Sequence, residues 1–226
     1  MFIGHFAPAF AARGITDEAP KLGTFFFAAQ FIDWVFFTLA IVGIEKVRLV
    51  PGITAMNPLD LYYMPYTHSL LASALWALGF GMVVWIVTRN PVAATWGAIV
   101  VVSHWLLDLL VHRPDLTIAG GETRYGFGLW NHPSIEMPLE IGLVLLAYCY
   151  YIRRTKGPLV PPLILLVALL LFQAIDWFGA KPEQAGVGMY LLALLGYAIL
   201  TALAFWVQTT RWHKNKVGLA VASVRR

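Results

Sequence analysis

Residues 102–113 read VSHWLLDLLVHR and end an apolar segment that is long enough to cross a membrane. Within this stretch His104, Asp108 and His112 stand at four-residue steps. On a helix each such step advances about 40° beyond a full turn, so the three side chains share a stripe roughly 80° wide. Ionisable groups at membrane depth are costly and usually face a bundle interior or a wet cavity. The stripe predicts a buried polar site; the alternative is a structural polar contact between helices.

The composition is that of an integral membrane protein. Of the 226 residues 59% are hydrophobic and 12% are charged, and the mean hydropathy of +0.71 is too high for a soluble globule. The formal net charge of +4 comes from basic residues in loops beside apolar segments, which is typical of membrane topology rather than of nucleic-acid binding. The single cysteine, Cys149, supports neither a disulfide framework nor a cysteine-based metal site.

Apolar runs of about 20 residues predict an all-α integral membrane protein with about six transmembrane helices plus an N-terminal half-helix, in one domain, residues 1–226. The predicted spans are 22–44, 65–88, 92–111, 135–152, 159–179 and 185–208. Residues 2–12 are too short to span and contain Pro8, so we expect a half-helix covered by protein and not a signal peptide. A glycine-rich loop, 116–134, and a basic tail, 211–226, complete the chain.

Lysine and arginine are divided unevenly between the two sides of the predicted bundle. Six spans put both polar ends of the chain on one side, which holds 11 of these residues, whereas the other side holds 5. The positive-inside rule therefore predicts a multi-pass protein whose N- and C-termini face the cytoplasm.

Histidines and carboxylates from several spans converge on the outer side of this bundle. His68 begins an inward-running span, while His104 and Asp108 end an outward-running one. Asp33 lies in the middle of the first span, and a short hairpin with the half-helix brings His5 near it. Imidazole and carboxylate are the usual ligands of zinc, manganese and iron. The predicted metal ligands are His5, Asp33, His68, His104 and Asp108.

Two glutamates at the start of the fourth span complete the predicted site. Glu136 and Glu140 are four residues apart and converge on the same outer side, where either can act as a general base on water. The bound metal, most simply zinc, would lower the pKa of that water and polarise an ester or phosphoryl oxygen. His112 lies at the membrane edge and is either a loop residue or an outer partner of the site. Glu136 and Glu140 can equally be solvated at the membrane interface.

Four short motifs give the chain a family resemblance. They are Gly4-His5-Phe6, Phe31-Ile32-Asp33, Tyr66-Thr67-His68-Ser69 and Ser103-His104-Trp105-Leu106-Leu107-Asp108. In these motifs the chain resembles the bacterial inner-membrane metal-dependent hydrolases, a family sometimes described as LexA-regulated. The match covers roughly residues 1–115, so the polar site is expected mainly there.

The resemblance implies a location in the bacterial inner membrane, a divalent metal and contact with membrane lipids. It also has departures. Family members commonly carry His-Arg-Gly before the Thr-His-Ser element, where this chain has Tyr63, Met64 and Pro65, and a second acid where it has Val35. These departures remove potential ligands of a second metal and bear on whether the site is active.

Three function classes remain open from the sequence. The first is a membrane-embedded metal-dependent hydrolase that acts on a lipid-like ester or phosphodiester, with its site open to the outer face. The second is a transporter or permease-like protein whose acids and histidines form an ion path. The third is a non-catalytic subunit of a larger membrane complex, or of a homo-oligomer, whose polar groups hold helices together. None of the three binds nucleic acid.

Overall fold

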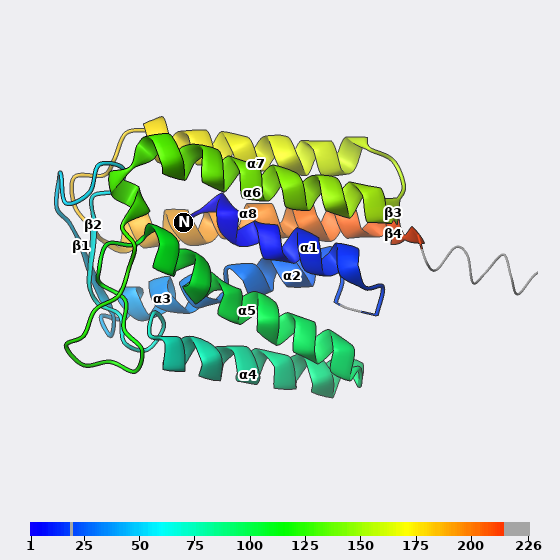
Figure 1. The fold of residues 1–226 in the computed structure, drawn as a ribbon, viewed down its shortest axis with the longest axis horizontal. Coiled ribbons are helices and arrows are strands. Elements are labelled where there is room, and N and C mark those ends of the chain that lie inside the picture. Colours follow the sequence, from blue (N-terminus) through cyan, green and yellow to red (C-terminus); the bar gives the residue numbers. More distant parts are fainter. Residues whose placement is uncertain (19, 215–226) are drawn as a thin grey trace, which may run out of the picture.

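The apolar segments form long helices that lie side by side in a bundle (Figure 1). The structure is a computed structural model and describes residues 1–18 and 20–214. Its five long apolar helices can each cross a membrane. They are α4 (Leu70–Thr88), α5 (Pro91–Val111), α6 (Pro133–Arg154), α7 (Val160–Phe178) and α8 (Val187–Thr210). This confirms the all-α membrane fold.

The first predicted span is broken rather than continuous. It consists of α2 (Leu22–Ala29) and α3 (Phe31–Ile41), which meet at Gln30 with a bend of 49°. Together the two helices count as a sixth span. A break inside a helix leaves backbone carbonyl groups without their usual partner four residues on. The carbonyl of Ala29 is one of these groups, and it is used by the site described below.

The N-terminal segment forms the expected half-helix inside the bundle. A 3-10 turn, η1 (Ile3–Phe6), leads into α1 (Ala7–Ile15), which packs against α2, α5 and α6. Pro8 lies in the first turn of α1, where its missing N–H group costs nothing. In Figure 1 this segment, in dark blue, lies in the middle of the bundle. A polar residue on η1 is thus placed among the other helices.

Helices α4 and α5 pack tightly as a hairpin, and α5 carries His104 and Asp108 of the site. The Ser69 hydroxyl caps α4 by accepting from the N–H of Ala72, and the Asn90 side chain caps α5 by accepting from the N–H of Ala93. Gly81 lets the two helices approach closely, because a Cβ atom there would lie 3.1 Å from the Ala94 carbonyl oxygen. Small residues at such contacts are typical of helices packed in membranes.

Short strands and turns close the two ends of the bundle. At one end lies the hairpin β1 (Lys46–Leu49) and β2 (Leu59–Tyr63), whose loop contacts the turn η2 (Leu129–Asn131) through a hydrogen bond from the Met56 N–H to the Trp130 carbonyl. At the other end β3 (Thr155–Lys156) pairs with β4 (Trp212–His213). We call these the hairpin end and the turn end.

The basic segments predicted to share one side meet at the turn end. Arg154 donates to the Gly14 carbonyl, and Asn90 donates to the Glu18 carbonyl. Arg211 donates to the carbonyls of the turn after α6. Met1 lies beside the site near the hairpin end instead. That the turn end faces the cytoplasm stays a prediction, and the part of the tail after residue 214 lies outside the described residues.

Candidate metal centre

The carboxylate of Asp108 lies at the centre of a buried group of histidines. Its Oδ1 atom is 3.1 Å from Nε2 of His5 and 3.5 Å from Nε2 of His112. Its Oδ2 atom is 3.2 Å from Nε2 of His104 and 3.6 Å from Nε2 of His68. One carboxylate therefore presents each of its oxygens to two imidazoles. His5 comes from η1, His68 from the loop before α4 and His104 from α5, and His112 directly follows α5.

A second carboxylate, Asp33 on α3, closes the group from the other side. Its Oδ1 atom is 3.4 Å from Nε2 of both His68 and His104, and its Oδ2 atom accepts a hydrogen bond of 3.0 Å from the Tyr197 hydroxyl. Asp33, His68 and His104 have ligand atoms close enough to hold one ion, as do His5, His104 and Asp108. The five residues predicted as metal ligands thus lie together, and that they bind a metal stays a prediction.

The other ring nitrogen of three histidines is held by a hydrogen-bond acceptor. Nδ1 of His104 donates to the Ala29 carbonyl at 2.9 Å, and Nδ1 of His112 donates to the Asp115 carboxylate at 2.9 Å. Nδ1 of His68 lies 2.8 Å from the Thr67 hydroxyl. In each neutral ring the proton is then on Nδ1, and Nε2 offers a lone pair to the centre. Outer partners of this kind orient the histidine ligands of metals.

This arrangement places lone pairs opposite carboxylate oxygens. Oδ2 of Asp108 and Nε2 of His104 have no hydrogen-bond partner among the described residues, and both residues are buried. An acceptor facing an acceptor in a buried site is unfavourable unless a proton or a cation lies between them. The ring of His5 stacks on that of His104, with centroids 3.7 Å apart, which makes the addition of several protons to the same group costly. The residues present therefore fit a divalent cation.

The Thr67 hydroxyl links His68 to a further carboxylate, Glu45. The O–H group of Thr67 donates to Glu45 at 2.6 Å, so the hydroxyl oxygen can accept from Nδ1 of His68. Glu45 also accepts from the backbone N–H groups of Tyr66 and Thr67. Burial raises the pKa of Glu45, although these donors stabilise its charged form. The chain from Glu45 through Thr67 to His68 holds the imidazole in one orientation.

We expect Thr67→Val to weaken metal binding by roughly 10–100-fold, because valine matches the shape of threonine but cannot accept from His68. Isothermal titration with zinc in detergent measures the change. Thr67→Ser keeps the hydroxyl and should bind zinc nearly as tightly as the parent. Equal affinity for the valine variant and the parent would contradict the role of this link.

The two predicted glutamates lie side by side on α6 but have different surroundings. Oε1 of Glu140 accepts from the backbone N–H groups of Phe2 and Gly4 at 2.7 and 2.8 Å, which anchors η1. Oε2 of Glu136 is buried and has no hydrogen-bond partner among the described residues. Both line the same pocket as Asp33 and Asp108. Glu140 thus anchors the segment that carries His5, and Glu136 has an oxygen without a hydrogen-bond partner among the described residues at the wall of the cavity.

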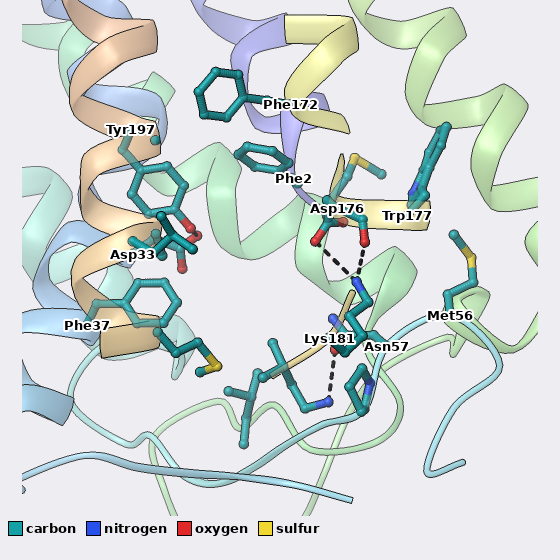
Figure 2. A pocket seen from close by; sticks show the side chains of 18 of the residues that line it. Phe2, Asp33, Phe37, Met56, Asn57, Phe172, Asp176, Trp177, Lys181 and Tyr197 are labelled. Atoms are coloured by element: carbon teal, nitrogen blue, oxygen red, sulfur yellow. Dashed lines mark hydrogen bonds and ion pairs between the residues drawn. The ribbon is translucent and has the colours of Figure 1, made fainter. Parts of the chain in front are cut away.

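A cavity of about 460 Å³ leads from this group to the surface. Figure 2 shows Asp33, Phe37 and Tyr197 on one side of it and Asp176 and Trp177 on the other. Its walls come from α3, α7 and α8, and the loop between β1 and β2 lies across its outer end. Cavities of this volume, largely apolar with a few polar groups at one point, are typical of small-molecule sites.

The structure also adds residues that the sequence analysis did not assign to the site. His112 is expected from the sequence in a loop or as an outer partner, and in the structure it lies against Asp108, as its position on the four-residue stripe indicates. Asp115, Glu45 and Tyr197 come from two loops and α8, and nothing in their local sequence marks them. Met1 contributes its amino group, 3.1 Å from Asp108.

Comparisons of the chain with protein-family models, with curated proteins and with solved structures found no match. The resemblance to membrane-bound metal-dependent hydrolases therefore stays a proposal that rests on the four motifs. The geometry shown here is a membrane-type helical bundle with a buried histidine and aspartate group that can hold a metal ion.

Proposed function

We propose that this protein is a membrane-embedded metal-dependent hydrolase that acts on a lipid-like ester or phosphodiester. The observation that carries the proposal is that the Nε2 atoms of two histidines, His68 and His104, face two carboxylates at the wall of a pocket. The carboxylates are those of Asp33 and Asp108. Imidazole and carboxylate groups suit zinc, and also manganese and iron. A cation held by His68, His104, Asp33 and Asp108 would activate water and polarise the oxygen of the scissile bond.

The residues around the group have distinct parts in this proposal. The free Oε2 atom of Glu136 takes the proton of the attacking water and returns it to the leaving oxygen. The Tyr197 hydroxyl holds Asp33 in place, and Glu140 holds η1 so that His5 reaches Asp108. Phe36 and the other aromatic walls of the cavity limit access of bulk water.

The packing toward the turn end favours an enzyme over an ion path. Fully buried apolar side chains of α1 and α2, among them Phe10, Phe25 and Phe26, lie between the site and the turn end. A proton or ion path through the bundle needs polar groups or water at this depth. The cavity beside the carboxylates, in turn, favours an enzyme over a subunit whose polar groups only join helices.

Metal content and turnover, measured together on detergent-purified protein, test the proposal. The parent is expected to carry about one or two equivalents of metal and to hydrolyse a phosphodiester or carboxylic ester presented in mixed micelles. Glu136→Gln should keep the metal and lose roughly 10²–10⁴-fold in turnover, because glutamine cannot accept the proton.

Glu183→Gln is the matched control, since Glu183 is exposed and does not line the cavity. It should keep both metal and turnover. Absence of metal after purification without chelators, with failure of reconstitution, would contradict the metal site. Bound metal with no turnover on any ester or phosphodiester would contradict the hydrolase.

A further inference from the structure

Helices α7 and α8 form one side wall of the cavity. Phe172 and Ile175 of α7 and Leu192, Leu195 and Ile199 of α8 all line it. In Figure 2 Tyr197 of α8 and Asp176 of α7 lie on different sides of the cavity. Both helices are long and apolar enough to cross a membrane. This side wall therefore lies within the membrane-spanning part of the protein.

Several of these lining residues are also on the outside of the bundle. Leu192 is 69% exposed, Ile175 is 66% exposed and Leu195 is 55% exposed. In a membrane-spanning helix such side chains contact acyl chains rather than water. The same residues thus contact the bilayer and form the wall of the cavity, so an acyl chain can pass from one to the other without crossing water.

At a small residue beside the cavity, α7 and α8 pack closely against each other. Gly196 on α8 lines the cavity, and a Cβ atom there would lie 3.2 Å from the ring of Phe172. Beyond it the cavity is walled by Phe37 and Tyr197 and reaches Asp33. A larger side chain at position 196 would therefore press on Phe172 at the wall of the cavity.

The outer rim of the cavity is polar. Lys181 follows α7 and pairs with Asp176, whose carboxylate is 3.7 Å from its Nζ atom. Among the described residues that line the cavity Lys181 is the one lysine or arginine, and its side chain is 38% exposed. A lysine at the edge of the membrane suits the phosphate of a lipid headgroup. The tryptophan beside it, Trp177, is the residue type that gathers at that level.

We propose that a glycerophospholipid of the bilayer enters sideways between α7 and α8, with an acyl chain along the Gly196 face and its phosphate at Lys181. This inference rests on the proposed function for the site, and it names the substrate class and its route. It places the ester and phosphodiester bonds of the lipid, which lie between headgroup and acyl chain, on the side of the cavity where Asp33 and Asp108 lie.

Photo-crosslinking with a phosphatidylglycerol that carries a diazirine in one acyl chain tests this entry. The full chain is reconstituted in vesicles of phosphatidylethanolamine and phosphatidylglycerol, and labelled peptides are identified by mass spectrometry. Labelling is expected at Phe37 and Tyr197, which are buried and out of reach of lipid outside the bundle. Gly196→Leu should reduce this labelling by about tenfold or more, because the leucine side chain meets Phe172 and obstructs passage between α7 and α8.

Gly188→Leu is the matched control. It is the same change on the same helix, at a glycine where an added Cβ atom has nothing within 4 Å, and its labelling should equal that of the parent. Labelling only of the outer faces of α7 and α8, or equal labelling of both variants at Phe37, overturns the lateral route.

The outcomes separate this inference from the proposed function. Metal loading and turnover of a water-soluble ester without labelling of Phe37 or Tyr197 would reject lipid entry and leave the hydrolase. Labelling of those residues without metal or turnover would reject the hydrolase and leave a lipid-binding cavity. Lys181→Gln should reduce labelling by phosphatidylglycerol more than labelling by an uncharged diacylglycerol probe, and equal loss would reject the phosphate contact.

Discussion

Replacing Asp108 by asparagine is expected to reduce metal affinity by more than about 100-fold. This loss is larger than the one expected when an outer hydrogen-bond partner such as Thr67 is removed. Each oxygen of Asp108 faces two imidazole Nε2 atoms, so no other described residue contacts as many of the histidines. The amide of asparagine removes the negative charge and donates to a Nε2 lone pair, which satisfies the histidine without a cation. Elemental mass spectrometry on detergent-purified protein measures the bound metal.

Asp176→Asn is the matched control for this experiment. Asp176 lines the same cavity, but its ion pair is with Lys181 and not with a histidine. The control should retain parental metal content, and His104→Ala should lose it as Asp108→Asn does. A monodisperse elution profile and a thermal transition for each variant establish folding. Full metal content in folded Asp108→Asn would disprove the centre described here.

Gly126→Ala is expected to destabilise the loop after α5 by roughly 2–5 kcal/mol, the largest structural effect that we predict for one methyl group. Gly126 has a φ of +155°, and an added Cβ atom would lie 2.4 Å from the carbonyl oxygens of both His112 and Arg113. The loop must move away, and the hydrogen bond from the Gly128 N–H to the His112 carbonyl is lost. His112 then shifts from Asp108. Thermal unfolding in detergent and limited proteolysis of the loop measure the change.

Gly121→Ala separates backbone strain from the clash. Gly121 also has a positive φ, +87°, but an added Cβ atom has nothing within 4 Å. Its cost should be only about 1–2 kcal/mol, which is that of the left-handed conformation alone. Similar transition temperatures for the two variants would show that the close approach of Gly126 to the loop backbone is unimportant.

The helices could be predicted from the sequence because hydropathy alone determines which segments leave water. Five of the six predicted spans agree with the observed helices to within a few residues, apart from the start of the second, where residues 65–69 form a turn before α4. The break at Gln30 could not be predicted, since no proline or glycine marks it. Gln30 is buried and donates to the Phe2 carbonyl, so the bend depends on a contact with a distant segment.

The candidate metal ligands were predictable for a related reason. Asp33 and Asp108 are charged groups in apolar segments, and such groups are costly at membrane depth unless they have a functional role or pair with another helix. Glu45 and Asp115 lie in polar loops, where a carboxylate carries no such signal, and only the folded chain brings them to His68 and His112. Hydropathy therefore identifies the ligands in the membrane and misses the partners that orient them.

The anchoring of η1 by Glu140 has a consequence for biosynthesis. The N–H groups of Phe2 and Gly4 precede their acceptor by 138 and 136 residues, and His5 precedes Asp108 by 103. At about 5–20 residues per second, the ribosome makes η1 roughly 7–30 s before it makes Glu140. During that time the N–H groups of Phe2 and Gly4 lack their acceptor, and of the two carboxylates that contact the segment only Asp108 on α5 is made earlier. Completion of the candidate metal centre is thus a late event, which follows synthesis of α6.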